Sequence, residues 1–416
     1  MSPHVPQDPC SCSAPPTGET RPGVERTSVV VTYAGVLQAH ERIREHIHRT
    51  PIWSCSSLAR IILPDSDEEA RQQEVVITPA TATSDAALPF PTTIKELLFK
   101  CENLQKIGAF KIRGALNAIS LSAAETIVTH SSGNHAQAVA LACQILERKA
   151  IVVMPKDSPQ PKVDAVRDTY GAEVRFCEPN QAARESMCAD VINEVGSASN
   201  KVELIHPYDD PRVVCGQGTL AVEFLEDACC NASSTGSTSS STTGSTRCTT
   251  TGKNISSLDA IVIAVGGGGL LAGCATAIRG WEREKFGTQS RKIKIIAAEP
   301  LNANDCYQSF TQKTRIDNVG PPKTIADSVK TNLGEVTLPI ILREVDHVIQ
   351  VSEDNIKRAM KLTFERSKLV VEPGAAVAVA AAMSEEMRRK CPECLRIGVV
   401  LCGGNLDIRK LPDLLL

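Results

Sequence analysis

The sequence predicts an α/β fold in which helices flank parallel sheets that are divided between two lobes. Short apolar runs occur at 126–129, 150–154 and 173–176, and continuous apolar runs occur at 260–265, 294–298 and 397–401. Such runs are typical of strands buried on both faces, as in parallel sheets covered by helices. Helical patterns follow these runs, so strands and helices alternate along the chain. With 416 residues, the chain is long enough for more than one lobe.

The first 28 residues are rich in Pro, Ser and Thr, and we expect them to form a disordered tail. They contain no apolar segment typical of a secretory signal, and Asp8, Glu19 and Glu25 argue against a mitochondrial leader. We therefore expect a cytoplasmic protein with 16 reduced cysteines. Cys391 and Cys394 have no second such pair, so they do not predict a zinc site.

We assign 29–125 and 204–416 to a large domain and 126–203 to a small domain. The cleft between two such lobes is the natural place for a ligand. Two segments of the large domain read as disordered insertions, because they lack periodicity and enough apolar residues to pack. The first, 64–91, is acidic and then rich in Ala, Thr and Pro, and the second, 229–257, is a Ser/Thr/Gly tract.

The charge and composition exclude several classes of partner. A formal net charge of −3 and a pI near 6.3 give no basic surface for nucleic acid. No stretch has the length and apolar purity of a transmembrane helix, so we expect no membrane partner.

Two motifs point to amine and phosphate chemistry. Lys111 lies within 108–115, directly before a helical pattern, where a lysine can form a Schiff base. Far downstream, the strand at 260–265 leads into Gly266, Gly267, Gly268 and Gly269 and then into another helical pattern. Backbone N–H groups of such a turn can surround a phosphate. A surface lysine and an ordinary glycine loop explain each motif singly, but together they suit pyridoxal 5′-phosphate.

A third motif, at 129–137, follows a strand and opens a helix. Ser131, Ser132, Asn134 and His135 gather at this helix start. Free N–H groups and hydroxyls there could hold a substrate carboxylate. An ordinary serine N-cap is the alternative interpretation.

With Glu299-Pro300 and the segment 401–405, these motifs follow the order seen in the fold-type II pyridoxal-phosphate enzymes. The chain resembles their serine racemase and serine/threonine dehydratase branch from about Tyr33 to Leu416. The resemblance implies the two-lobed, tryptophan synthase beta-like form of the α/β fold. It also implies a small amino-acid substrate, a homodimer and ATP as a candidate activator.

The resemblance assigns roles around the cofactor. Lys111 would be the Schiff-base lysine and general base, with Phe110 beside the cofactor ring. Asn134 would bond the phenolic oxygen, and Gly266 to Gly269 would hold the phosphate. Cys402 would lie opposite the ring nitrogen, at a position where racemases typically carry serine and some dehydratases carry cysteine.

The resemblance also assigns substrate contacts. Ser132 would face Lys111 across the substrate Cα, and Ser131 and His135 would help to seat the carboxylate. Arg184 matches a racemase arginine near the closing small domain, although an exposed helical arginine is the ordinary alternative.

A divalent-cation site is expected after the strand at 294–298. The carboxylates of Glu299 and Asp305 and the carbonyl of Ala303 match the cation loop of the family. They are hard oxygen ligands suited to Mg²⁺ or Ca²⁺, while two solvated acids are the alternative.

We expect an L-serine or L-threonine ammonia-lyase that forms a 2-oxo acid and ammonia. Cys402 and the loop 206–211, which resembles the dehydratase version, favour this activity. Serine racemase with side dehydratase activity is the close alternative, and hydroxyaspartate dehydration is a third. A catalytically silent ligand sensor belongs to another class, and the intact Lys111 and Ser132 argue against it.

Overall fold

The computed structural model describes residues 30–63, 76–77, 94–158, 160–197, 200–233, 258–287 and 291–415. The predicted tail and most of both predicted insertions lie outside these residues. Within the first insertion, β3 (Val76–Ile77) pairs with β2 (Ile61–Ile62) in a short antiparallel ladder. Helix α8 (Pro211–Ser233) continues beyond position 229, where we expect the second insertion to begin.

A six-stranded sheet forms the centre of the larger lobe, in the order β1-β4-β12-β9-β10-β11. Neighbouring strands are parallel, as predicted, except that β1 pairs antiparallel with β4. Strand β1 is a partly exposed, three-residue edge strand, so no apolar run marks it in the sequence. The strands are β1 (Ile52–Ser54), β4 (Glu96–Lys100), β9 (Ala260–Ala264), β10 (Lys294–Pro300), β11 (His347–Val351) and β12 (Arg396–Val400).

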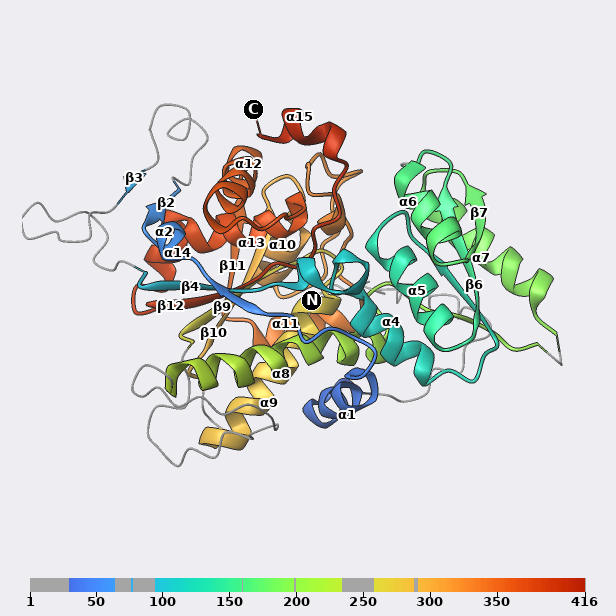
Figure 1. Ribbon diagram of the computed structural model, residues 1–416, viewed down its shortest axis with the longest axis horizontal. Coiled ribbons are helices and arrows are strands. Elements are labelled where there is room, and N and C mark those ends of the chain that lie inside the picture. Colours follow the sequence, from blue (N-terminus) through green and yellow to red (C-terminus); the bar gives the residue numbers. More distant parts are fainter. Residues whose placement is uncertain are drawn as a thin grey trace, which may run out of the picture.

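Helices cover both faces of this sheet (Figure 1). Helices α1, α8 and α9 lie on one side, and α10, α12 and α13 lie on the other. Helix α13 is alanine-rich and buried from Gly374 to Met383, because its small side chains allow close packing on the strands. The bounds of these and the smaller helices are α1 (Tyr33–Ile43), α2 (Ser56–Ala59), α9 (Gly269–Phe286), α10 (Asp305–Gln312), α11 (Thr337–Glu344), α12 (Glu353–Leu362), α13 (Pro373–Met383), α14 (Glu385–Lys390) and α15 (Leu411–Leu415).

A second sheet of four parallel strands forms the smaller lobe, in the order β7-β6-β5-β8. Three strands match predicted runs, whereas β8 has only three partly exposed residues and was not predicted. The division at 126–203 stays a prediction, although this sheet lies within nearly the same limits. The strands are β5 (Thr126–His130), β6 (Lys149–Pro155), β7 (Glu173–Cys177) and β8 (Val202–Leu204).

Helices also cover both faces of the small sheet. Helices α4 (Lys111–Ser120) and α5 (Asn134–Ile145) pack with Ile127 and Val152, while α7 (Gln181–Val195) packs on the opposite face. Helix α6 (Gln160–Asp164) runs into a π-helical turn at Ala165–Thr169, where the sequence predicts one continuous helix. In the described part of the chain, no helix has the length and apolar character needed to cross a membrane.

Candidate active site

Lys111 is the first residue of α4, and its side chain is half-buried. Lys111 Nζ donates a hydrogen bond to the Pro207 carbonyl at 2.9 Å and lies 5.2 Å from the centre of the Phe110 ring. Burial lowers the pKa of Lys111 to about 8, although the acidic groups of Cys402 and Glu372 act in the opposite direction. The neutral amine of a lysine is the form that attacks a carbonyl group. A pKa of about 8 leaves a larger fraction of Lys111 in that form at neutral pH.

The last sequence motif lies directly against the Lys111 segment. Ala109 and Gly403 form an antiparallel bridge. The Phe110 N–H donates to the Cys402 carbonyl at 3.1 Å. Cys402 is buried, and burial raises the pKa of its thiol, which therefore stays neutral. Residues almost 300 positions apart in the chain thus meet at the end of β12.

Asn134, the first residue of α5, is held by two side chains of the larger lobe. Its Nδ2 donates to both carboxylate oxygens of Glu372 at 3.1 Å, and its Oδ1 accepts from Asn405 Nδ2 at 2.9 Å. Burial raises the pKa of Glu372, while the bond from Asn134 partly opposes this shift. No sequence motif marks Glu372, since an acid before Pro373 indicates only a helix start.

The other polar residues at the start of α5 have different environments. Ser131 Oγ accepts the Gly133 N–H at 3.2 Å, whereas the Ser132 hydroxyl makes no hydrogen bond to any described residue. His135 is buried, and its Nδ1 has no hydrogen-bond partner within the described chain. Burial, and then the charge of Lys111, lower the pKa of His135 well below its usual value, so this imidazole is neutral.

The glycine turn after β9 leaves no room for side chains. Gly268 has a φ of +87° and is the N-cap of α9, which no side chain caps. A Cβ on Gly267 would lie 2.3 Å from the Tyr208 ring, and one on Gly268 would lie 2.6 Å from Thr337 Oγ1. Uncapped N–H groups at the start of an 18-residue helix can bind a phosphate, so this turn fits pyridoxal phosphate.

The loop after β8 contacts both Lys111 and the glycine turn. Its Pro207 carbonyl accepts from Lys111, and the next residue, Tyr208, packs against Gly267. The His206 ring contacts Tyr208 edge-on, with 4.7 Å between ring centres. Burial, and then the nearby His130, lower the pKa of His206 to about 4, so this ring is neutral at physiological pH. Lys111 and the glycine turn are therefore neighbours through one loop.

Arg184 lies on α7, away from these contacts. Its Nε is buried and has no hydrogen-bond partner among the described residues. After burial, Arg184 is the main cause of the lowered pKa of His130, so the guanidinium lies near the end of β5. No hydrogen bond joins Arg184 to Lys111 or Ser132 within the described chain.

Glu299 and Asp305 lie together beyond β10. Glu299 accepts the N–H groups of Cys306 and Tyr307, while Asp305 accepts from Leu333 N–H at 2.9 Å and Asn318 Nδ2 at 2.8 Å. Burial raises the pKa of both carboxyls, that of Asp305 to about 6, and the charge of Asp305 raises the pKa of Glu299 further.

These two acids fit a cation site that is completed by backbone oxygen. Neither forms an ion pair with a lysine or arginine of the described residues. Ala303 is buried in the same loop and could add its carbonyl oxygen. The described part of the chain contains no group of three or more His, Cys, Asp or Glu side chains that could hold a metal.

A short segment before and within α11 joins the cation loop to the glycine turn. Leu333 donates its N–H to Asp305, as described above. The adjacent Gly334 N–H lies 3.4 Å from the Gly267 carbonyl, which also accepts from Thr337 Oγ1 at 2.9 Å. Lys111 is thus connected to Cys402 through Phe110 and to the glycine turn through the loop 206–211. Asn134 is connected to the segment before Lys111 through Asn405, which also donates to the Ile107 carbonyl. Leu333 and Gly334 connect Asp305 to the glycine turn.

Comparisons with known proteins agree with this arrangement. The sequence model of the pyridoxal-phosphate dependent enzyme family matches residues 77–403. The chain is 37% identical to the serine racemase of Dictyostelium discoideum, over 92% of this chain and 98% of the relative. It is 34% identical to the beta-hydroxyaspartate dehydratase of Paracoccus denitrificans (strain Pd 1222), over 92% of this chain and 99% of the relative.

Solved structures give the same grouping. The structure of maize serine racemase matches with a TM-score of 0.71 and 32% identity, over 92% of this chain and 96% of that chain. The structure of the T.th. threonine deaminase matches with a TM-score of 0.67 and 33% identity, over 91% of this chain and 99% of that chain.

Proposed function

Because this chain belongs to the pyridoxal-phosphate dependent enzyme family, we propose that it is a serine racemase that also converts serine to pyruvate and ammonia. It is an enzyme that depends on pyridoxal phosphate and acts as a racemase or an ammonia-lyase. The relatives support the racemase alternative at least as well as the ammonia-lyase that the sequence motifs place first.

The observation that carries the proposal is the position of Lys111 and Ser132 at the starts of two helices that pack together, α4 and α5. When bound, pyridoxal phosphate withdraws electrons from the substrate Cα and so makes its hydrogen acidic. Lys111 would take or return that proton on one face of the Cα, and Ser132 would do so on the other. The Ser132 hydroxyl has no competing partner in the described chain, so it is free to exchange a proton.

The remaining residues would bind the substrate and the cofactor and hold them in position. The start of α5, with Ser131 and His135, would hold the substrate carboxylate through N–H and hydroxyl groups. The turn Gly266–Gly269 would hold the phosphate, and Asn134 would bond the phenolic oxygen. Phe110 would lie beside the cofactor ring, the neutral Cys402 thiol beside its nitrogen, and Arg184 at the edge of the small lobe.

An assay of purified protein with L-serine and pyridoxal phosphate tests the proposal. We expect both D-serine and pyruvate, measured by chiral chromatography and by coupled reduction of pyruvate. L-threonine and L-aspartate serve as alternative substrates in parallel reactions. Pyruvate without any D-serine would contradict the racemase and leave the ammonia-lyase, while no conversion of any of the three amino acids would favour the silent ligand sensor.

The ammonia-lyase remains the second candidate because of one loop. The loop at 206–211 reads His-Pro-Tyr-Asp-Asp-Pro, a dehydratase-like sequence. It contacts both Lys111 and the glycine turn. The likeness to the Paracoccus dehydratase and to threonine deaminase supports the same activity.

We further propose that Glu299, Ala303 and Asp305 bind Mg²⁺ or Ca²⁺, and we expect this cation to stabilise the protein increasingly above about pH 6. The folded-state pKa of Asp305 is about 6, above its ordinary value of 3.8, so its contribution to stability without a cation is lost as pH rises through this window. A cation binds the ionised carboxylates and opposes that loss, by about 2.7 kcal/mol at a concentration of 100 Kd.

Melting temperature measured against pH, with Mg²⁺ or with a chelator, checks this prediction. Glu299→Gln should abolish the difference between the two conditions, whereas Glu335→Gln, an exposed control, should retain it. Equal melting temperatures with cation and chelator in the parent protein, at every pH, would contradict the site.

A homodimer, activation by ATP and a cytoplasmic location also remain predictions. Light scattering would measure the mass against the 44.6 kDa of one chain. The initial rate with and without ATP would test activation.

A further inference from the structure

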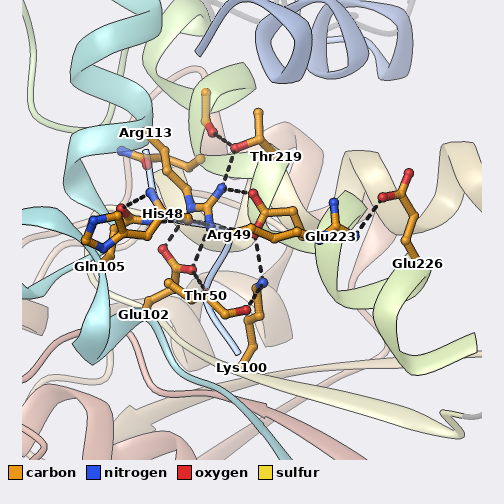
Figure 2. A network of polar contacts seen from close by, with 12 residues as sticks. His48, Arg49, Thr50, Lys100, Glu102, Gln105, Arg113, Thr219, Glu223 and Glu226 are labelled. Carbon is orange, nitrogen blue, oxygen red and sulfur yellow. Dashed lines mark hydrogen bonds and ion pairs between the residues drawn. The ribbon is translucent and has the colours of Figure 1, made fainter. Parts of the chain in front are cut away.

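Arg113 lies two residues after Lys111 and is the centre of a buried network of charged groups (Figure 2). Its guanidinium forms two forks, each a pair of hydrogen bonds to both oxygens of one carboxylate. Nε and Nη2 donate to the two oxygens of Glu102, each at 2.8 Å, and Nη1 and Nη2 donate to those of Glu223 at 2.7 and 2.8 Å. Two bidentate forks fix the plane of a guanidinium and leave it little rotational freedom.

Neighbouring groups complete the network. Lys100 Nζ donates to Glu223 and to the Thr50 carbonyl, both at 2.7 Å. Arg113 Nη1 also donates to Thr219 Oγ1 at 3.2 Å. The two cations and the two carboxylates balance in charge, and all four residues are buried. Burial alone would raise the pKa of Glu223, but Arg113 and Lys100 outweigh it and lower this pKa to about 2, so the carboxylate stays ionised.

The network ties the first turn of α4 to three separate parts of the larger lobe. Lys100 is in β4, Glu102 follows it in a 3-10 turn at Glu102–Leu104, and Glu223 and Thr219 are in α8. Helices α4 and α8 also approach closely, since a Cβ on Gly114 would lie 2.8 Å from the Val213 carbonyl. This turn of α4 therefore has little freedom to shift or rotate.

Lys111 and Arg113 extend in different directions from the same turn. Successive residues of an α-helix are about 100° apart, so two positions separate these side chains by about 200°. The Lys111 amine reaches the Pro207 carbonyl, whereas the Arg113 guanidinium points into the charged network. A rotation of the turn that disturbs Arg113 must therefore move the Lys111 amine.

We propose that Arg113 is a positioning residue, which sets the place of the Lys111 amine by clamping the opposite side of its helical turn to Glu102 and Glu223. The proposal rests on the proposed function of Lys111 as the lysine that attaches the cofactor. Stability alone does not account for the arrangement well, because buried ion pairs are often replaceable by apolar residues of similar volume. The two forks fix the rotation of the first turn of α4 around the helix axis, which apolar packing does not do.

The test compares Arg113→Lys with Arg279→Lys in the holoenzyme. Arg279 is a matched control: it is equally buried and donates to Glu282, Asp346 and two backbone carbonyls, but lies in the second half of α9. A lysine keeps the charge in both variants, but only at position 113 does it remove two forks to carboxylates, since Arg279 makes one bond to each of its carboxylates. The readouts are kcat and KM for L-serine, melting temperature, and the ratio of visible circular dichroism to absorbance of the bound cofactor.

We expect both variants to lose melting temperature, but only Arg113→Lys to lose kcat, by about 10- to 100-fold, with little change in KM. Its dichroism-to-absorbance ratio should also change, because the cofactor is attached at a displaced amine. If Arg113→Lys fails to fold, Thr219→Val removes one contact of Arg113 and should shift the same two readouts by a smaller amount.

The proposal would be overturned if a folded Arg113→Lys or Thr219→Val variant showed no larger change in kcat and in the dichroism ratio than Arg279→Lys shows. The dichroism ratio separates this outcome from a failure of the proposed function. A parent protein that binds the cofactor without converting serine would contradict the proposed racemase. Its variants would still test the positioning role of Arg113 through the dichroism ratio.

Discussion

Replacing Lys111 by alanine is expected to abolish turnover and the visible absorbance of the attached cofactor at about 410–420 nm. The loss should exceed the about 10²–10⁴-fold typical of a missing general base, because the same amine also supplies the attachment. Lys111 suits both roles, because its half-buried amine has a pKa lowered to about 8 and donates to the Pro207 carbonyl. Product formation and the absorbance spectrum are measured on the same preparation.

Lys361→Ala is the control for this experiment, because Lys361 is exposed on α12, far along the chain from the glycine turn. It should keep the parent's absorbance and rate. A Lys111→Ala protein that retained both properties would show that another residue attaches the cofactor, and the site described here would be wrong.

Ser132→Ala is expected to separate the two activities. Racemisation needs a proton donor on the face of the Cα opposite Lys111, whereas elimination from L-serine needs only the proton removed by Lys111 and the departure of the hydroxyl. D-serine formation should therefore fall by about 10²–10⁴-fold, while pyruvate formation from L-serine falls much less. Elimination from D-serine should fall together with racemisation, since it starts on the Ser132 face. All three rates are measured for the variant and the parent.

Ser131→Ala is a matched control, because Ser131 is adjacent and accepts a hydrogen bond from Gly133. If Ser131 only seats the carboxylate, its loss should lower both products from L-serine by the same factor. Equal fractional losses in Ser132→Ala as well would mean that Ser132 positions the substrate without exchanging a proton, and the racemase proposal would lose its main support.

The sequence predicted the central strands well because burial on both faces leaves a local signal. Strands β9 and β12 are continuous apolar runs, and β9 ends where the glycine turn begins. Strands β1 and β8 have three residues each and are partly exposed, so their apolar content does not distinguish them from loops. Their place in the sheets depends on partners distant in the sequence.

The residues of the candidate site also differ in whether a local sequence pattern marks them. Lys111 and the glycine turn carry their chemistry within a few residues, so the sequence indicated them directly. Glu372 and Arg113 differ, because the side chain of Glu372 contacts Asn134 and that of Arg113 contacts Glu223, each more than a hundred positions away. A single glutamate or arginine in a helical pattern carries no sign of such partners. The sequence placed elimination before racemisation because of Cys402 and the loop 206–211, whereas the relatives support racemisation at least as well.

The segment that bridges the cation loop and the glycine turn has a thermodynamic consequence. Leu333 and Gly334 are adjacent residues that bond to Asp305 and to the Gly267 carbonyl, respectively. If Asp305 binds a cation as proposed, that cation should also order the glycine turn, which we propose holds the cofactor phosphate, and so tighten cofactor binding. Linkage is reciprocal, so bound cofactor must strengthen cation binding by the same factor. A shortage of either the cation or the cofactor would then lower the occupancy of both sites.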